Sequence, residues 1–231
     1  MSLLSCSDIR FQYPGAENVL FDGLTFSIAR PGFHALFGPS GIGKTTLAKI
    51  ISGDIGPLSG QVEATGEAPC LYTYNRERLP GWSSVGRHIE KSTPMGRESL
   101  RDDLIRQFGL SSLMGMRFST LSMGQCNRVN LLRYLLQDFG LLIMDESLAN
   151  VDEATRQTIL YKIKATFPAS GFLYISHNVV EVARFCDQIL VCRGVKKSPR
   201  IKCIEGQDHK KDQPLDEKRL EASMLEIMNA A

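Results

Sequence analysis

A glycine-rich stretch with a lysine and two threonines lies at residues 38–46. Gly38, Gly43, Lys44 and Thr45 fit the phosphate-loop pattern G-x-x-x-x-G-K-[ST] without a mismatch. Backbone N–H groups can wrap a triphosphate only where the chain turns tightly, which glycine permits. Lys44 would supply a positive charge to the β- and γ-phosphates as a candidate catalytic residue, and the Thr45 hydroxyl would ligate Mg²⁺. This stretch therefore predicts a site for a nucleoside triphosphate and Mg²⁺.

The candidate nucleotide contacts in this stretch are Gly38, Pro39, Ser40, Gly41, Gly43, Lys44, Thr45 and Thr46. The apolar run 33–37 before it suits a buried strand, and the run 46–51 after it suits a helix. The positive amino-terminal end of that helix would point at the phosphates. The alternative is a glycine-rich turn with a lysine there by chance, but the flanking elements favour a phosphate loop.

Two carboxylates follow the apolar run 141–144, which suits a strand buried on both faces of a parallel sheet. Asp145 lies where a phosphate-loop protein needs a second Mg²⁺ contact, so we predict it to be a metal ligand. Glu146 could orient or deprotonate the water that attacks the γ-phosphate. His177 follows another buried run, 172–175, and ligands gather at the carboxyl ends of parallel strands. Glu146 and His177 are therefore candidate catalytic residues.

Each of these residues also has an alternative interpretation. Asp145 could be a helix N-cap and Glu146 a solvated neighbour. His177 could be a polar residue at a strand end whose hydrogen bonds are satisfied. The phosphate loop upstream favours the metal interpretation of Asp145, whereas His177 taken alone leaves both interpretations open.

Composition limits the class of protein. The chain has 231 residues, of which 43% are apolar, enough for a sizeable core in one large domain. The net charge of +2 argues neither for nor against a nucleic-acid partner, and none is expected. The sequence contains no apolar run long enough to span a membrane and no secretory signal pattern. The six cysteines form no C-x-x-C pair, so we expect reduced thiols in the cytosol rather than a zinc site.

Strand patterns and helix patterns alternate along most of the chain. Strands are predicted at 7–12, 24–29, 33–37, 61–64, 70–74, 141–144, 172–175, 188–192 and 200–204. Helices are predicted at 46–51, 99–108, 126–137, 153–165, 178–186 and 216–228. This alternation predicts a mostly parallel sheet between helices. The predicted fold class is α/β: a P-loop NTPase three-layer core with a mostly parallel sheet, an N-terminal antiparallel β layer and an inserted helical subdomain.

The predicted domain organisation is one domain over residues 1–231. From residue 75 the chain mixes charged residues, glycines and prolines with short helical patterns, and we predict a helical subdomain at 75–138. Residues 194–231 are predicted to form a C-terminal tail with an amphipathic helix. Trp82, the single tryptophan, could be an anchor that binds another protein, but we predict that it lies in the core.

Taken together, the motifs resemble those of one family, the nucleotide-binding subunits of ABC transporters. The Walker A motif, the LSGGQ signature, the Walker B strand with its glutamate, the D-loop and the switch histidine correspond to 38–45, 121–125, 141–146, 149–152 and 176–177. All of them occur in the family order, and the resemblance extends over about residues 7–193. The combination is more specific than any single motif.

The resemblance implies ATP as the nucleotide and ATP hydrolysis coupled to transmembrane transport. It implies that Tyr13 stacks on adenine. It also implies a head-to-tail dimer with a second ABC ATPase subunit, expected to be a homodimer, in which ATP lies between one phosphate loop and the other signature. Ser122, Gly124 and Gln125 would lie at the nucleotide, with Ser122 and Gly124 contacting the γ-phosphate in trans. The other implied partners are integral membrane permease subunits, and the implied location is cytoplasmic, on the inner face of the cell membrane.

Four positions depart from the family pattern. Met123 replaces the first glycine of the signature, and the Q-loop glutamine is expected near Tyr74 or Asn75, neither of which is glutamine. Ser147 stands where the family has proline, and Asn150 replaces the alanine of the D-loop. These departures bear on turnover and on coupling to the membrane partner.

The segment Leu79–Trp82 resembles the corresponding part of ATPase subunits of nitrate, sulfonate and taurine importers. We therefore expect an ATP-hydrolysing subunit of a solute importer, because the catalytic residues are intact. The alternative is a soluble or regulatory ABC ATPase with weak or no turnover.

Overall fold

The computed structural model describes residues 2–64, 68–194 and 197–231. It divides into two compact units, each described by itself below. The sheet unit consists of Met1–Tyr72, Gly140–Asp145 and Pro168–Ala231. The helical unit consists of Thr73–Phe139 and Glu146–Phe167. Val195 and Lys196 of the predicted tail lie outside the described residues.

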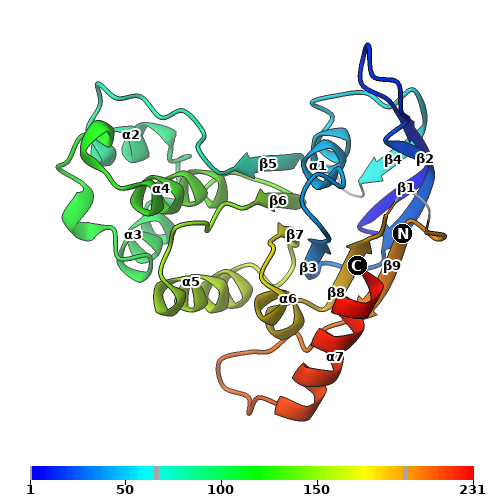
Figure 1. The fold of residues 1–231 in the computed structure, drawn as a ribbon. Coiled ribbons are helices and arrows are strands. Elements are labelled where there is room, and N and C mark those ends of the chain that lie inside the picture. The colour runs from blue at the N-terminus through cyan, green and yellow to red at the C-terminus, as the bar shows by residue number, and fades with distance from the viewer. Residues whose placement is uncertain (1, 65–67, 195–196) are drawn as a thin grey trace. The chain divides into compact units, whose positions relative to one another are not determined.

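A six-stranded sheet forms the centre of the sheet unit (Figure 1). In spatial order its strands are β5 (Cys70–Tyr74), β6 (Leu141–Asp145), β7 (Gly171–Ile175), β3 (Gly32–Phe37), β8 (Gln188–Cys192) and β9 (Ile201–Glu205). Strand β7 runs parallel to both β6 and β3, and β3 runs parallel to β8, whereas β9 is antiparallel to β8. Every residue of β6 and β7 is buried, which explains their continuous apolar sequences.

Both faces of this sheet are covered within the sheet unit. One face packs against α1 (Lys44–Ser52) and a second, antiparallel sheet, and one apolar cluster joins all three. The other face packs against α6 (Val179–Phe185), which contacts β3, and carries the stacked rings of Phe33 and Phe172. Successive side chains of a strand point to opposite faces, so Leu173 joins the cluster while Phe172 does not. The result is a three-layer arrangement (Figure 1).

The antiparallel sheet is formed by β2 (Phe21–Ile28), β1 (Leu4–Phe11) and β4 (Ser59–Ala64), with β1 in the middle. The tail adds β9 to the parallel sheet, and α7 (Glu217–Ala230) packs against α6 and β9 (Figure 1). Ile227 of α7 is fully buried there, as its amphipathic pattern requires.

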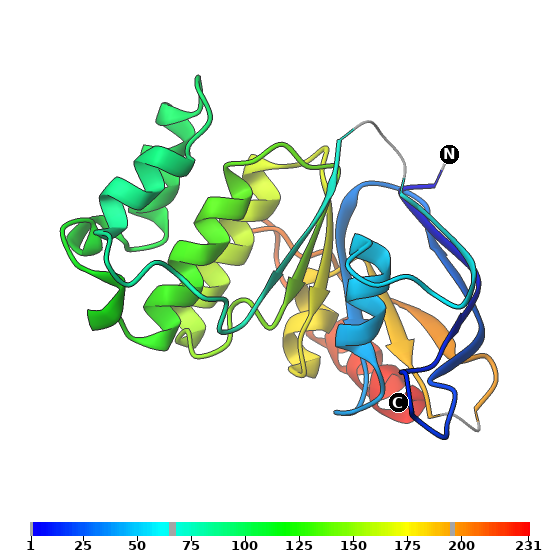
Figure 2. The same ribbon diagram turned by 90° about the horizontal axis from the view of Figure 1, so that it is seen from above.

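The helical unit contains four α-helices and two short 3₁₀ helices among its described residues. They are α2 (Val85–Ser92), α3 (Glu98–Gln107), η1 (Ser111–Leu113), η2 (Phe118–Thr120), α4 (Met123–Leu135) and α5 (Glu153–Thr166). Helix α4 contacts α2 and α3, and α3 also contacts α5. These helices are coloured green to yellow-green in Figure 2.

The predicted α/β fold class is confirmed, including the antiparallel layer and the mostly parallel sheet. One helix start was wrong: α4 begins at Met123 and not at Cys126. The reason is a capping box, in which the Ser122 side chain accepts from the Gln125 N–H while the Gln125 side chain accepts from the Ser122 N–H. Over the described parts of the chain, every helix is too short or too polar to cross a bilayer.

A histidine, His34, lies in the middle of β3 with only 1% of its surface exposed. Its Nε2 is 3.0 Å from the carbonyl oxygen of Arg30, and because a carbonyl can only accept, Nε2 carries the proton. Its Nδ1 finds no hydrogen-bond partner among the described residues. Burial lowers the pKa of His34 below its ordinary 6.5, and the bond to Arg30 opposes that shift.

His34 is therefore harder to protonate in the folded protein than in the unfolded chain. Stability conferred by neutral His34 should be present above about pH 6.5 and decline as the pH falls below it. Urea unfolding between about pH 7.5 and pH 5 measures this loss. The variant His34→Gln keeps an N–H donor but does not titrate, so its stability should depend less on pH. Equal pH dependence in both proteins would contradict the assignment.

Candidate nucleotide-binding site

The phosphate loop connects β3 to α1, and two of its glycines are required by close backbone approach. Gly38 has φ 151°, and a Cβ there would lie 2.6 Å from the carbonyl oxygen of Cys192. Gly43 has φ 107°, and a Cβ there would lie 2.8 Å from a ring carbon of Phe21. Both glycines therefore hold the loop against the sheet unit, in conformations that side chains rarely adopt.

Lys44 reaches back across the loop. Its Nζ donates to the carbonyl oxygens of Gly38 at 2.8 Å and of Pro39 at 2.9 Å. The ammonium thus lies beside the exposed part of the loop, which comprises Pro39, Ser40 and Gly41. This puts a positive charge where the sequence predicted phosphate binding.

The first turn of α1 also favours an anion. Five helices begin at a Ser, Asp or Asn whose side chain accepts from a first-turn N–H: α2, α4, α5, α6 and α7. Helix α1 instead begins after Gly43, which makes no side-chain cap. Its first-turn N–H groups and the positive end of its dipole are thus left for an external acceptor.

A hydroxyl and a carboxylate meet beside this loop. Thr45 Oγ1 donates to Asp145 Oδ2 at 2.7 Å, although the two residues are 100 apart in sequence. Tyr72 Oη donates to the same carboxylate oxygen at 3.0 Å. Oxygen atoms of this kind are the ligands that Mg²⁺ prefers. The role of Tyr72 was missed, although a tyrosine in a buried strand usually needs a partner for its hydroxyl.

Three candidate segments follow three adjacent parallel strands. Asp145 pairs in register with Ile175 of β7, and Leu36 of β3 pairs with Ile175 from the other side. Asp145, the phosphate loop after Phe37 and His177 after β7 therefore emerge at the same edge of the sheet, and His177 is exposed there.

The turn before His177 is held by a buried carboxylate. Glu181 Oε2 accepts from Tyr174 Oη at 2.8 Å and from Ser176 Oγ at 3.4 Å. Ser176 Oγ in turn accepts from the N–H of Asn178 at 3.1 Å. These bonds order the residues on both sides of His177.

Tyr13 lies two residues beyond the end of β1 and is half exposed. Its ring packs edge-on against Phe11, and its hydroxyl is 2.7 Å from Thr46 Oγ1. The predicted adenine contact is thus anchored to the residue that follows Thr45.

Within the helical unit, the signature segment forms the start of α4. The side chains of Ser122 and Gln125 close the capping box, at 3.2 Å and 2.8 Å. Gly124 is buried, and a Cβ there would lie 2.2 Å from the carbonyl oxygen of Asn150. The thioether of Met123 accepts from Asn150 Nδ2 at 3.2 Å. Two of the four departures from the family pattern, Met123 and Asn150, therefore contact each other.

Glu146 is exposed and opens the turn that follows β6, with φ 50°. The N–H of Ala149 donates to its carbonyl oxygen at 2.9 Å. Ser147, which stands in place of proline, donates from Oγ to the carbonyl oxygen of Thr73 at 3.1 Å. Asp152 then caps α5, and the N–H of Thr155 lowers the pKa of its carboxyl group.

The segment after β5 lies along one face of α4. Glu77 Oε2 accepts from Asn130 Nδ2 at 2.8 Å and from Tyr134 Oη at 2.9 Å, and Glu77 also pairs with Arg133. Burial and this carboxylate raise the pKa of Tyr134, which keeps its phenol a donor. Asn75, at the Q-loop position, accepts from Asn127 Nδ2 at 3.0 Å.

Two cavities lie in the helical unit. The first, of about 440 Å³, is lined by Trp82, Ser83, Ser84, Arg87, Lys91, Gly115 and Arg117. The core prediction for Trp82 was wrong, because 86% of this side chain is exposed. For a single aromatic residue in a loop rich in glycine and proline, the sequence does not indicate whether the side chain packs against its own chain or against another protein.

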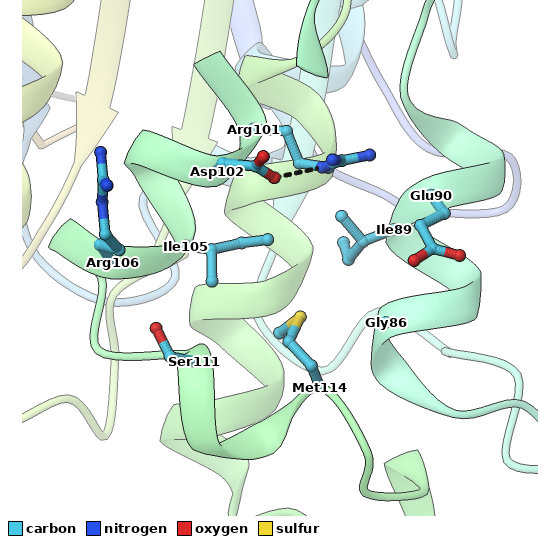
Figure 3. Close-up of a pocket in the computed structure, with 9 residues that line it drawn as sticks. All are labelled: Gly86, Ile89, Glu90, Arg101, Asp102, Ile105, Arg106, Ser111 and Met114. Carbon is cyan, nitrogen blue, oxygen red and sulfur yellow. Dashed lines mark hydrogen bonds and ion pairs between the residues drawn. The ribbon is translucent and has the colours of Figure 1, made fainter. Parts of the chain in front are cut away.

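The second cavity, of about 330 Å³, lies between α2, α3 and η1. Figure 3 shows Ile89, Ile105 and Met114 pointing into it. The arginines at its rim have carboxylate partners: Arg101 donates to Asp102 at 2.7 Å, and Arg106 lies 3.5 Å from Asp103. This cavity therefore lacks the net positive charge of the first.

The sheet unit thus brings together Tyr13, the phosphate loop, Asp145 and His177. The helical unit contains the other predicted site residues, which are Ser122, Gly124, Gln125 and Glu146.

Comparison with known proteins agrees with this geometry. The ABC transporter family matches residues 21–149, and the chain belongs to that family. Two solved structures share its fold: an ATP-binding subunit of an ABC transporter (TM-score 0.73, 22% identity, covering 82% of this chain and 85% of that one) and a bacterial Atm1-family ABC exporter with ATP bound (TM-score 0.72, 23% identity, covering 81% and 36%).

Relatives with higher identity are importer subunits by name. The molybdenum import ATP-binding protein ModC of Brucella suis biovar 1 (strain 1330) is 38% identical over 184 residues, which cover 71% of this chain and 51% of the relative. The aliphatic sulfonates import ATP-binding protein SsuB 3 of Paraburkholderia xenovorans (strain LB400) is 35% identical over 179 residues, covering 76% and 71%. The chain thus spans about half the length of the Brucella ModC proteins it matches.

The contact between Gly124 and Asn150 leads to a prediction. The variant Gly124→Ala should lose about 1–3 kcal/mol of stability through overpacking, although alanine favours helices by about 1 kcal/mol. Equilibrium urea unfolding measures the difference. The control is Gly115→Ala, because no described atom lies within 4 Å of a Cβ at that position. Equal stabilities of the two variants would show that the close approach is not maintained in solution.

Proposed function

We propose that this chain binds ATP with Mg²⁺, hydrolyses the ATP, and so powers a solute importer as its ATP-binding subunit. The observation that carries the proposal is the shared sheet edge at which the phosphate loop, Asp145 and His177 emerge from three adjacent parallel strands. Membership of the ABC transporter family supports it.

The residues present fit the nucleotide and the metal. Thr45 Oγ1 and Asp145 Oδ2 are hard oxygen ligands that already lie 2.7 Å apart, and they would hold Mg²⁺. Lys44 Nζ and the first-turn N–H groups of α1 would hold the phosphates, and Tyr13 would stack on adenine. When bound, Mg²⁺ supplies positive charge that offsets the charge developing on the phosphates.

The remaining chemistry falls to side chains of this chain. The Glu146 carboxylate would accept a proton from the attacking water, and His177 would donate a hydrogen bond to the γ-phosphate. Lys44 would stabilise negative charge on the phosphate oxygens.

A second subunit would complete the site. The capping box engages the N–H groups of Ser122 and Gln125 but not those of Met123 and Gly124, which would remain available to a γ-phosphate held by the partner subunit. This supports a head-to-tail homodimer with ATP between the phosphate loop of one subunit and the signature of the other.

A membrane permease is the proposed partner of the helical unit. The cavity beside Trp82 is lined by Arg87, Lys91 and Arg117 and by no carboxylate. An exposed tryptophan among cations suits an acidic segment with an apolar anchor, as a cytoplasmic loop of a permease could offer. The chain would then lie on the inner face of the cell membrane, and the choice of solute would rest with its partners.

The second candidate function is ATP binding with weak or no turnover. It is favoured by Met123 in the signature and by Asn75, whose side-chain oxygen is already bonded to Asn127. The rate of phosphate release separates the two functions.

Replacing Glu146 with glutamine should remove the proton acceptor and leave nucleotide binding intact. Steady phosphate release should fall by about 10²–10⁴-fold. The variant should also dimerise more stably in ATP and Mg²⁺, as measured by light scattering after gel filtration. Glu153→Gln, an equivalent change at an exposed glutamate, should match the unsubstituted protein.

Two results would contradict the proposal. A Glu146→Gln variant that stays monomeric in ATP and Mg²⁺ would rule out the sandwich dimer. Phosphate release that is undetectable, or that survives Lys44→Ala, would favour the second candidate function.

The double variant Trp82→Ala, Arg117→Glu should weaken permease binding. Loss of an aromatic anchor that becomes buried on binding costs about 2 kcal/mol or more of binding free energy, which raises Kd roughly 30-fold. The measurement is the yield of a polytopic membrane protein that co-purifies in near-equal amount from detergent-solubilised native membranes. Arg106→Glu, beside the other cavity, is the control and should retain the membrane protein (Figure 3). Equal loss in both variants would show that the Trp82 cavity has no specific role.

A further inference from the structure

The turn that follows β6 contains two residues in an unfavourable backbone conformation. Glu146 has φ 50° and Asn150 has φ 62°, in the left-handed region that residues other than glycine rarely adopt. Such conformations persist only where neighbouring groups hold them in place. The orientation of Glu146 therefore depends on whatever fixes this turn.

Two buried polar side chains hold the turn from within the helical unit. Ser147, 2% exposed, donates to the carbonyl oxygen of Thr73 at 3.1 Å. Asn127, 5% exposed, donates from Nδ2 to the carbonyl oxygen of Ala149 at 2.7 Å. Ala149 is also the residue whose N–H closes the turn on the Glu146 carbonyl oxygen.

The same nitrogen of Asn127 makes a second bond, to Asn75 Oδ1 at 3.0 Å. An amide nitrogen has two hydrogens, and here each has its own acceptor. Breaking either bond would leave a buried polar group unsatisfied, which is costly. A single buried amide therefore ties the segment after β5 to the turn that begins at Glu146.

We propose that Asn127 is a positioning residue that orients Glu146 for ATP hydrolysis and links its orientation to the position of Asn75. This inference rests on the proposed function, in which Glu146 accepts the proton from water. Asn75 acts as a hydrogen-bond acceptor within the helical unit. Trp82 lies seven residues further along the same segment, so a partner that shifts this segment would reorient Glu146 through Asn127.

Asn130 provides a matched control. It is one turn further along α4, 3% exposed, and its Nδ2 donates to Thr73 Oγ1 at 3.2 Å and to Glu77 Oε2 at 2.8 Å. It holds the same segment after β5, and among the described residues its side chain bonds to Thr73, Glu77 and Arg133 rather than to the Glu146 turn. Its bond to Thr73 reaches the side-chain Oγ1 and not the carbonyl oxygen that holds Ser147, so loss of Asn130 should cost stability but disturb Glu146 much less than loss of Asn127 does.

The first experiment compares Asn127→Ala with Asn130→Ala in steady-state hydrolysis. We expect Asn127→Ala to lower kcat by about 10- to 100-fold with little change in the KM for ATP, because misplacing a catalytic group slows the chemical step. Asn130→Ala should stay close to the unsubstituted kcat. Hydrogen exchange should accelerate in a peptide covering 146–151 for Asn127→Ala only, and urea unfolding reports whether both variants are folded.

Two further variants separate positioning from general damage. Asn75→Asp keeps an oxygen acceptor for Asn127 and should retain more activity than Asn75→Ala. Asn127→Ala should cause no further loss in a Glu146→Gln background, because its effect acts through the Glu146 carboxylate.

Three outcomes would overturn the inference. They are an equal loss of kcat for Asn130→Ala, an equal further loss in the Glu146→Gln background, and an unchanged kcat despite faster exchange in 146–151. If Glu146→Gln itself leaves turnover unchanged, the proposed role of Glu146 fails, and the inference fails with it.

Discussion

The parallel alignment of β6, β7 and β3 is the constraint on which the rest of the candidate site depends. These strands are buried on both faces, so apolar packing fixes their register, and the candidate site residues lie at their ends. Asp145, the phosphate loop and His177 are polar because they lie just beyond that packing. The bond from Thr45 to Asp145, 100 residues away, can form only because two strand ends coincide at one edge.

The helical unit achieves precision by other means. Besides its buried apolar side chains, it has directional bonds along one face of α4, where Asn127, Asn130 and Tyr134 hold the segment after β5. Apolar contacts tolerate small shifts, whereas a buried amide with two acceptors does not. Through such a network, a shift of the segment after β5 would change the orientation of Glu146. The sheet unit, by contrast, needs only to stay fixed.

Much of the sheet unit could be predicted from the sequence, because continuous apolar runs and a glycine-rich motif are local signals. The start of α4 was placed three residues late, although the pattern S-x-x-Q at Ser122 and Gln125 marks a capping box. Asn127 could not be identified in this way. Its partners lie 52 and 22 residues away, and helical periodicity predicts buried apolar residues but not buried amides. The prediction for Trp82 was wrong for a related reason. Composition does not distinguish an aromatic side chain in the core from an exposed one that binds another protein.

The strand register also determines where the chain can change length during evolution. A strand advances about 3.3 Å per residue and alternates its faces, so inserting or deleting one residue within β7 would displace His177 and reverse the side chains before it. The connections at the amino-terminal edge of the sheet have no such restriction, because none of the candidate segments begins there. Homologues that keep the same chemistry should therefore vary in length at that edge and keep β3, β6 and β7 constant.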